Sequence, residues 1–255
     1  MYHLDGVTKC YRSARDGGVV RALDGVGLFV EDGDGLVVRG PAGAGKSTLL
    51  RILGGLERPT RGSVVLNGTD LATVTECRLA RIRAESVGIA LGTGGDLPPG
   101  LTVRQSVAGA LVPLGLRPAD CRELADRALA EVGVPDEQLT WPTHELDAGS
   151  QRLVALARAL VKRPSVLLAD QPTAGLPAGA RACVVAVFAR LWSERRLSCV
   201  VATEDDALAR HAPRLATLSR GRVTALTRRR GAGPAVPSGR PATRPVQGRD
   251  DRRDE

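Results

Sequence analysis

The order of apolar and polar positions along the chain predicts an α/β fold. Short apolar runs predict strands, and apolar residues spaced three or four apart predict helices. The predicted strands cover residues 2–8, 19–29, 36–38, 62–68, 166–169 and 198–202. The predicted helices cover residues 49–56, 76–84, 103–112, 119–132, 149–161 and 178–196. Strands that alternate with helices are typical of an α/β core, and the helix-only stretch between about residues 85 and 160 predicts a second, helical lobe.

A glycine-rich segment separates the strand at 36–38 from the helix at 49–56. Its residues are Gly40, Pro41, Ala42, Gly43, Ala44, Gly45, Lys46, Ser47 and Thr48. Gly-x-x-x-x-Gly-Lys-Ser between a strand and a helix is the phosphate-binding P-loop pattern. Backbone N–H groups would cradle the anion, Lys46 would reach the β and γ phosphates, and the Ser47 hydroxyl would face Mg²⁺. A plain glycine-rich turn is the alternative.

Lysine usage favours the P-loop over that alternative. The chain has 36 basic residues, of which only Lys9, Lys46 and Lys162 are lysine. A lysine at the P-loop position by chance is therefore improbable, and the sequence predicts nucleotide binding.

The net charge of +8 is unevenly placed. From residue 228 to 255 there are eight Arg against four Asp or Glu, a net of +4 and half of the total. This stretch also has four prolines, several glycines and no apolar periodicity, so it is predicted to be a disordered tail. Its interleaved acidic residues and its lack of aromatics argue against a nucleic-acid or anionic-membrane contact and favour a solvated tail.

Apolar run lengths and cysteine spacing bear on location. No run of about 18 apolar residues predicts a membrane span, and residues 1–9 do not resemble an export signal. The five cysteines are far apart and form no Cys-x-x-Cys pair. Reduced thiols in the cytoplasm are the simplest interpretation.

Several segments around the P-loop resemble the ATP-binding subunit of an ABC transporter, of the lipoprotein-release and macrolide-export type. The segments are Asn67-Gly68 and residues 97–103, 145–151, 154–160 and 167–173. The resemblance covers residues 2 to about 226. It implies a P-loop NTPase (RecA-like) core with an antiparallel β subdomain and a helical ABC signature subdomain, within one domain of residues 1–227 and followed by the tail 228–255.

The resemblance also implies ligands and partners. ATP and Mg²⁺ are the expected cofactors. A membrane permease subunit and a second ABC ATP-binding subunit, in a homo- or heterodimer, are the expected partners. The chain would then lie in the cytoplasm, at the inner face of the membrane if a permease partner exists.

Two residues outside the P-loop match ligand-binding positions of the family. Tyr11 falls where the family stacks an aromatic ring on adenine, although an aromatic at the edge of the core is the alternative. Asp170 ends the apolar strand 166–169 and matches the aspartate that holds Mg²⁺ together with Ser47. A carboxylate at the end of a buried strand would be costly without a cation nearby.

Other positions depart from the family pattern. Gln171 replaces the glutamate that activates water, and an amide cannot take a proton. Glu204, an acceptor-only anion, replaces the histidine that donates to the γ-phosphate. Gly92 replaces the glutamine that senses Mg²⁺, and Pro177 replaces an aspartate. Asp147 replaces the signature serine: it can still cap a helix, but its charge would oppose a phosphate.

These departures leave two hypotheses. In the first, the chain is an ATP-binding subunit that binds Mg-ATP but is impaired in hydrolysis. In the second, it is a non-catalytic ABC-like module that binds nucleotide and regulates or scaffolds a partner. A heterodimer that keeps one intact site does not explain the losses. Gln171 and Glu204 replace catalytic residues, and Asp147 replaces the signature serine, so both kinds of motif are affected in this one chain.

Overall fold

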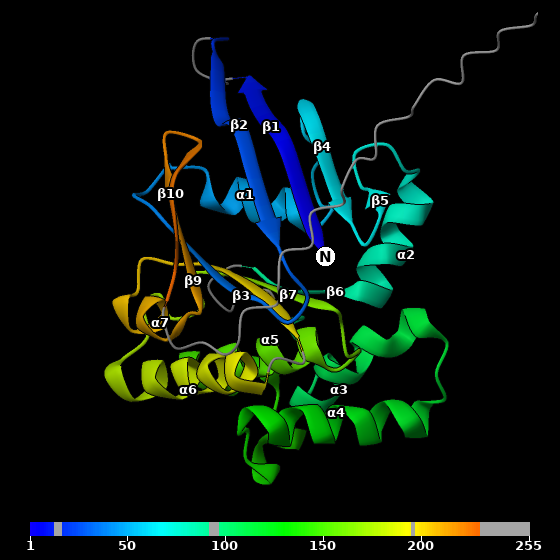
Figure 1. The fold of residues 1–255 in the computed structure, drawn as a ribbon. Coiled ribbons are helices and arrows are strands. Elements are labelled where there is room, and N and C mark those ends of the chain that lie inside the picture. The colour runs from blue at the N-terminus through cyan, green and yellow to red at the C-terminus, as the bar shows by residue number, and fades with distance from the viewer. Residues whose placement is uncertain (13–16, 92–96, 195–196, 230–255) are drawn as a thin grey trace, which may run out of the picture.

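Two β-sheets form the framework of the fold (Figure 1). The computed structural model describes residues 1–12, 17–91, 97–194 and 197–229. A four-stranded antiparallel sheet has the order β2-β1-β4-β5 and contains β1 (Tyr2–Arg12), β2 (Val19–Val30), β4 (Arg61–Leu66) and β5 (Thr69–Asp70). A six-stranded sheet has the order β10-β9-β3-β8-β7-β6 and contains β3 (Gly35–Arg39), β6 (Val87–Ala90), β7 (Val166–Asp170), β8 (Ser198–Ala202), β9 (Arg214–Ser219) and β10 (Arg222–Arg228).

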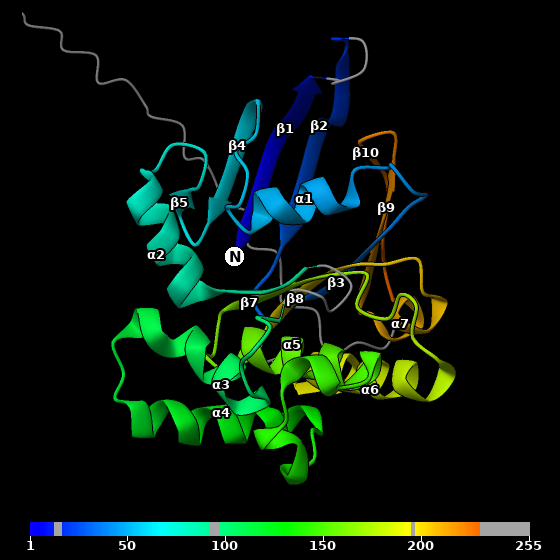
Figure 2. The ribbon, with the colours of Figure 1, turned by 180° about the vertical axis from the view of Figure 1, so that it is seen from behind.

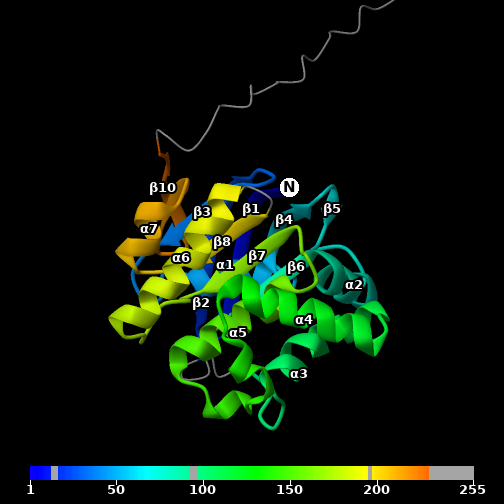
Figure 3. The ribbon, with the colours of Figure 1, turned by 90° about the horizontal axis from the view of Figure 1, so that it is seen from below.

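The helices are divided between the two faces of the six-stranded sheet. On one face, α1 (Lys46–Leu53) lies between the two sheets, as Figure 2 shows from behind. The opposite face is covered by α5 (Ala148–Leu160) and α6 (Ala178–Glu194), seen from below in Figure 3. The other α-helices of the described residues are α2 (Glu76–Ser86), α3 (Val103–Ala108), α4 (Pro118–Val132) and α7 (Asp206–His211). In the described parts of the chain, no helix is long and apolar enough to cross a membrane.

Alternation along the central strands builds two hydrophobic cores. Side chains of successive strand residues point to opposite faces of a sheet. In β7, Leu168 packs with α1 and the antiparallel sheet, while Leu167 packs with α5 and α6 on the other side. Since both faces are covered, all the side chains of Val166 to Ala169 are fully buried. The fully apolar sequence of this strand follows from that burial.

The parallel strands bring three distant parts of the chain to one edge. β3 pairs with β8, and β8 pairs with β7, all in parallel. Their carboxyl ends therefore lie next to one another, at the kind of edge where α/β sheets bind ligands. The P-loop follows β3, Gln171 follows β7 and Glu204 lies shortly after β8.

The structure confirms most predicted elements and corrects some of them. The stretch from 85 to 160 is not purely helical, because Val87–Ala90 forms β6, which pairs with β7 at the end of the core sheet. The elements β5, α7, β9 and β10 were not predicted. β10 extends to Arg228, and the Arg229 N–H donates to the Pro213 carbonyl at 2.9 Å, so the described fold continues slightly past residue 227. The rest of the predicted tail, 230–255, lies outside the described residues.

Candidate functional site

The P-loop is a tight turn that two of its glycines make possible. Gly45 caps α1 with φ 103°, a conformation that L side chains rarely adopt. A Cβ at Gly40 would lie 2.0 Å from the Leu218 carbonyl oxygen, so only glycine fits there. The loop is also held from the turn between β9 and β10, because the N–H of Gly221 donates to the Ala44 carbonyl at 3.0 Å. The sequence pattern thus corresponds to a shaped loop.

The start of α1 is open to an anion. The first N–H groups of any helix have no acceptor within that helix. Among the residues that the structure describes, no side chain caps the N-terminus of α1, and its first turn contains no acidic residue. The positive end of the helix dipole and these N–H groups therefore face the loop without a protein anion at the cap.

Lys46 lies within the loop and has three acceptors. Its Nζ donates to the carbonyl oxygens of Gly40 at 2.6 Å and Pro41 at 3.0 Å, and to Oε1 of Glu204 at 2.9 Å. The Lys46 side chain is only 6% exposed, whereas that of Glu204 is 56% exposed. The ion pair joins residues 158 positions apart in the chain.

A pocket of about 300 Å³ collects most of the predicted site residues. Its lining is Ala22, Ala42, Gly43, Ala44, Gly45, Lys46, Ser47, Thr48, Gln171 and Glu204. Gln171 has φ 49°, which is uncommon for a residue with a side chain, and its N–H donates to the Ala202 carbonyl at 2.8 Å. The loop, Gln171 and Glu204 therefore meet at this pocket, because they follow the adjacent parallel strands β3, β7 and β8. Ala22 is a lining residue that the sequence did not indicate.

Asp170 lies directly beside this pocket without being part of its lining. It is the last residue of β7, and α1, which carries Ser47, packs against that strand. Within the described residues, the buried Oδ1 of Asp170 has no hydrogen-bond partner. A buried carboxylate oxygen without a partner is costly unless a cation or donor joins it. Asp170 and Ser47 supply hard oxygen ligands of the kind that Mg²⁺ takes, so these residues fit such an ion.

Tyr11 lies next to the P-loop helix. Its hydroxyl donates to Oε2 of Glu57 and lies 3.5 Å from Oγ1 of Thr48, and the Nζ of Lys9 lies 5.2 Å from the centre of its ring. Burial, followed by the hydrogen bond to Glu57, raises the pKa of Tyr11. The Tyr11 side chain is thus held against Thr48, which belongs to the pocket lining. Glu57, which fixes it, was not predicted from the sequence.

Asp147 caps helix α5. Its Oδ1 accepts hydrogen bonds from the N–H groups of Gly149 at 2.8 Å and Ser150 at 3.1 Å, and its Oδ2 accepts one from the Ser150 hydroxyl at 2.7 Å. The hydroxyl and then the N–H group of Ser150 hold the pKa of Asp147 below its usual range. A stable anion therefore occupies the start of α5, as the capping interpretation predicted.

Gly92 and its neighbours fall outside the described residues, so the replacement at that position stays a sequence prediction. Pro177 is exposed directly before α6, and its carbonyl accepts from the N–H of Arg181 at 2.9 Å. That contact supports the first turn of the helix.

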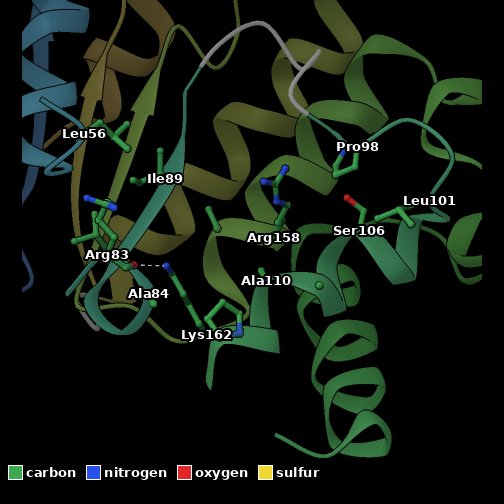
Figure 4. Close-up of a pocket in the computed structure, with 14 residues that line it drawn as sticks. Leu56, Arg83, Ala84, Ile89, Pro98, Leu101, Ser106, Ala110, Arg158 and Lys162 are labelled. Carbon is green, nitrogen blue, oxygen red and sulfur yellow. Dashed lines mark hydrogen bonds between the residues drawn. The ribbon is translucent and has the colours of Figure 1, made fainter. Parts of the chain in front are cut away.

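A second, larger cavity of about 520 Å³ lies between the core and the helical lobe (Figure 4). Leu56, Arg83 and Ile89 line it from the core side, and Ser106 and Ala110 from the lobe. Lys162 follows α5, and its Nζ donates to the Arg83 carbonyl at 2.5 Å. None of the predicted nucleotide-site residues belongs to this lining. Burial lowers the pKa of Lys162 to about 8.

The Lys162 shift predicts a specific pH dependence of stability. The pKa falls from the ordinary 10.5 to about 8 in the folded chain, so between these values the unfolded chain binds more protons. The free energy of unfolding should therefore rise with pH across this window. Lys162→Met should remove that rise, measured as the difference between the two proteins in urea denaturation at pH 7.5, 9 and 10.5. A difference that stays constant over this range would contradict the assignment.

Comparisons with known proteins show the family of the chain and agree with its fold. Residues 23–174 match the family model described as ABC transporter. The lipoprotein-releasing system ATP-binding protein LolD of Geobacter metallireducens is 37% identical over 206 residues, which are 81% of this chain and 91% of that protein. The uncharacterized ABC transporter ATP-binding protein YvrO of Bacillus subtilis is 33% identical over 223 residues, 88% of this chain and 95% of that protein.

A solved structure shows the same arrangement in three dimensions. The dimeric ATP-binding cassette MJ0796, in a post-hydrolysis state bound to ADP and Pi, superposes with a TM-score of 0.84 at 30% identity. The match covers 91% of this chain and all of that one. The family model spans more than half of the chain, and the relatives match over most of their length. The chain belongs to the ATP-binding subunits of ABC transporters.

Proposed function

We propose that this ATP-binding subunit holds Mg-nucleotide through its P-loop and hydrolyses ATP poorly. The observation that carries the first half is the open start of α1 behind a loop that only glycine can form at residues 40 and 45. Within the described part of the chain, the buried Oδ1 of Asp170 has no hydrogen-bond partner, and the helix that carries Ser47 packs against the strand that Asp170 ends; both observations support a Mg²⁺ ion at this edge. When bound, that ion would neutralise phosphate charge.

Adenine recognition is proposed for Tyr11. Its ring lies beside α1, held by Glu57 and close to Thr48, where it could stack on a base whose phosphates lie in the loop. The alternative of an aromatic at the core edge is compatible with the same contacts. Tyr11→Ala distinguishes the two interpretations. Loss of a stacking ring should weaken the binding of adenine nucleotides by more than tenfold and leave the binding of inorganic triphosphate unchanged.

Impaired hydrolysis is proposed from the chemistry of two pocket residues. Gln171 lines the phosphate pocket where a base is needed, and an amide can orient water without accepting its proton. Loss of a general base costs about 10²–10⁴ in rate. Glu204 in the same lining adds a negative charge where a donor is needed.

The partners are proposed from the relatives. The similarity to a lipoprotein-releasing ATP-binding protein supports a membrane permease subunit as partner, with this chain at the cytoplasmic face. The solved cassette MJ0796 is a dimer, which supports pairing of this chain with a second ABC ATP-binding subunit. Asp147 and Glu204 are expected to oppose a tightly closed ATP-bound dimer. The comparisons favour a transporter subunit over a regulatory or scaffolding module.

Gln171→Glu tests the proposed impairment. This single change should leave Mg-ATP turnover at the level of the Lys46→Ala variant, because Gly92, Asp147 and Glu204 remain. The combined variant Asp147→Ser, Gln171→Glu and Glu204→His should show higher turnover than Gln171→Glu alone. Recovery of efficient turnover in Gln171→Glu by itself would show that the other replacements matter little.

A further inference from the structure

The contacts of Lys46 leave its ammonium group fully occupied. An ammonium has three N–H donors and no acceptor. Its three acceptors here are two loop carbonyls and Glu204, all within 3.0 Å of Nζ. A phosphate oxygen that is to be bound by Lys46 must therefore displace or share one of these contacts.

Glu204 is the acceptor that can move. The carbonyls of Gly40 and Pro41 belong to the backbone of the tight loop, whereas the Glu204 side chain is 56% exposed and can turn into water. Its two neighbours in the chain are nevertheless fixed. The Thr203 N–H donates to the Val38 carbonyl at 3.1 Å, and Asp205 caps α7 through the N–H of Ala207 at 2.8 Å. A carboxylate that leaves Lys46 therefore stays at the rim of the pocket.

Glu204 also cancels the charge of the pocket. Among the described lining residues, only Lys46 and Glu204 carry a formal charge at neutral pH, so their charges sum to zero. Neither residue caps the N–H groups at the start of α1. The pocket thus offers one set of neutral donors and one cation that already has a counter-ion.

We propose that Glu204 makes this site selective for nucleoside diphosphates over nucleoside triphosphates. The inference rests on the proposed nucleotide binding by the P-loop and names the ligand class of that site. A diphosphate can use the loop N–H groups and share Lys46 with Glu204, because only its β-phosphate meets the ammonium group. A third phosphate brings further negative charge toward Lys46 and has to compete with the carboxylate, by which it is also repelled.

The test compares the dissociation constants of Mg-ADP and Mg-AMPPNP, a non-hydrolysable triphosphate, by isothermal titration calorimetry on the full chain. The natural chain should bind Mg-ADP at least tenfold more tightly than Mg-AMPPNP. Glu204→Gln keeps an acceptor oxygen and removes only the charge. It should lower the dissociation constant of Mg-AMPPNP at least tenfold and change that of Mg-ADP less than threefold, so that the preference disappears.

Asp206→Asn is the matched control. Asp206 lies two residues further along, pairs with Arg39 at 2.6 Å and is not part of the pocket lining. Removing its charge changes the net charge as much as Glu204→Gln does, and should leave the preference for Mg-ADP unchanged. A melting curve of each variant verifies that it is folded.

The outcomes separate this inference from the proposed function. If the ratio of the two dissociation constants is the same in the natural chain and in Glu204→Gln, Glu204 is not the selective group. The same holds if Asp206→Asn shifts that ratio as much as Glu204→Gln does. If the natural chain binds neither nucleotide and behaves as Lys46→Ala does, the proposed nucleotide binding fails and the inference falls with it.

Discussion

Lys46→Ala is expected to abolish the rise in melting temperature that Mg-ADP produces in the natural chain. Among the described residues that line the phosphate pocket, Lys46 is the only cation, and its substitution leaves that lining with the negative charge of Glu204. A ligand at 100 times its dissociation constant stabilises a protein by about 2.7 kcal/mol, and all of this should be lost. Differential scanning fluorimetry with and without Mg-ADP measures the shift.

The reference for this variant is Lys162→Ala. Both changes remove one lysine, but Lys162 lines the larger cavity between core and lobe, away from the P-loop. Lys162→Ala should keep the Mg-ADP shift of the natural chain. The relevant quantity is the shift and not the melting temperature itself, because Lys46→Ala also removes two hydrogen bonds to loop carbonyls. An undiminished shift in Lys46→Ala would show that Mg-ADP does not bind at the P-loop.

Arg214→Ala is expected to be strongly destabilising, at about 3–5 kcal/mol, because it leaves a buried charge without its partner. Arg214 begins β9 and contacts the Asp34 carboxylate through its NH1 group, which also donates to the Phe29 carbonyl at 3.0 Å. Both residues are buried, at 9% and 7% exposure. The pair joins β9 to the segment that leads into β3, and β3 carries the P-loop.

Urea denaturation measures this loss, with Arg222→Ala as the comparison. Arg222 also contacts an aspartate, Asp24, at 2.6 Å, but its side chain is 68% exposed, so its removal should have only a small effect. Equal losses in the two variants would mean that burial of the Arg214 and Asp34 pair does not matter for stability.

Local patterns were sufficient for much of the fold. Strands β3, β7 and β8 are short apolar runs buried on both faces, and the P-loop pattern locates the turn after β3. The helix α5 was also predictable, because Asp147 precedes it as a cap. In each case, the deciding interactions lie within a few residues of the chain.

The elements that were missed depend on distant partners or on weak signals. Val87–Ala90 is a strand because it pairs with β7, about 80 residues later, and a four-residue apolar run does not distinguish a strand from part of a helix. The two-residue β5 exists only as a partner of β4. By contrast, β9 alternates between buried and half-buried residues from Arg214 to Ser219, so its period-two pattern was a usable signal.

The same distinction holds within the candidate site. Lys46, Ser47 and Asp170 were predicted because family motifs name them at fixed positions. The contact between Lys46 and Glu204 was not predicted, since it spans 158 residues and depends on how β8 lies beside β3. From the sequence, Glu204 could be identified only as a residue that replaces the histidine of the family. Its role as the counter-ion of Lys46 follows from the fold.

The most direct test of the central claim is Mg-ATP turnover measured on a preparation whose nucleotide binding has been verified. The same assay is run on Lys46→Ala purified in parallel, with phosphate release followed at saturating Mg-ATP. We expect the natural chain to bind nucleotide saturably, with a turnover that does not exceed that of Lys46→Ala. Turnover well above the Lys46→Ala level would contradict it, and would show that Gln171 and Glu204 leave hydrolysis intact.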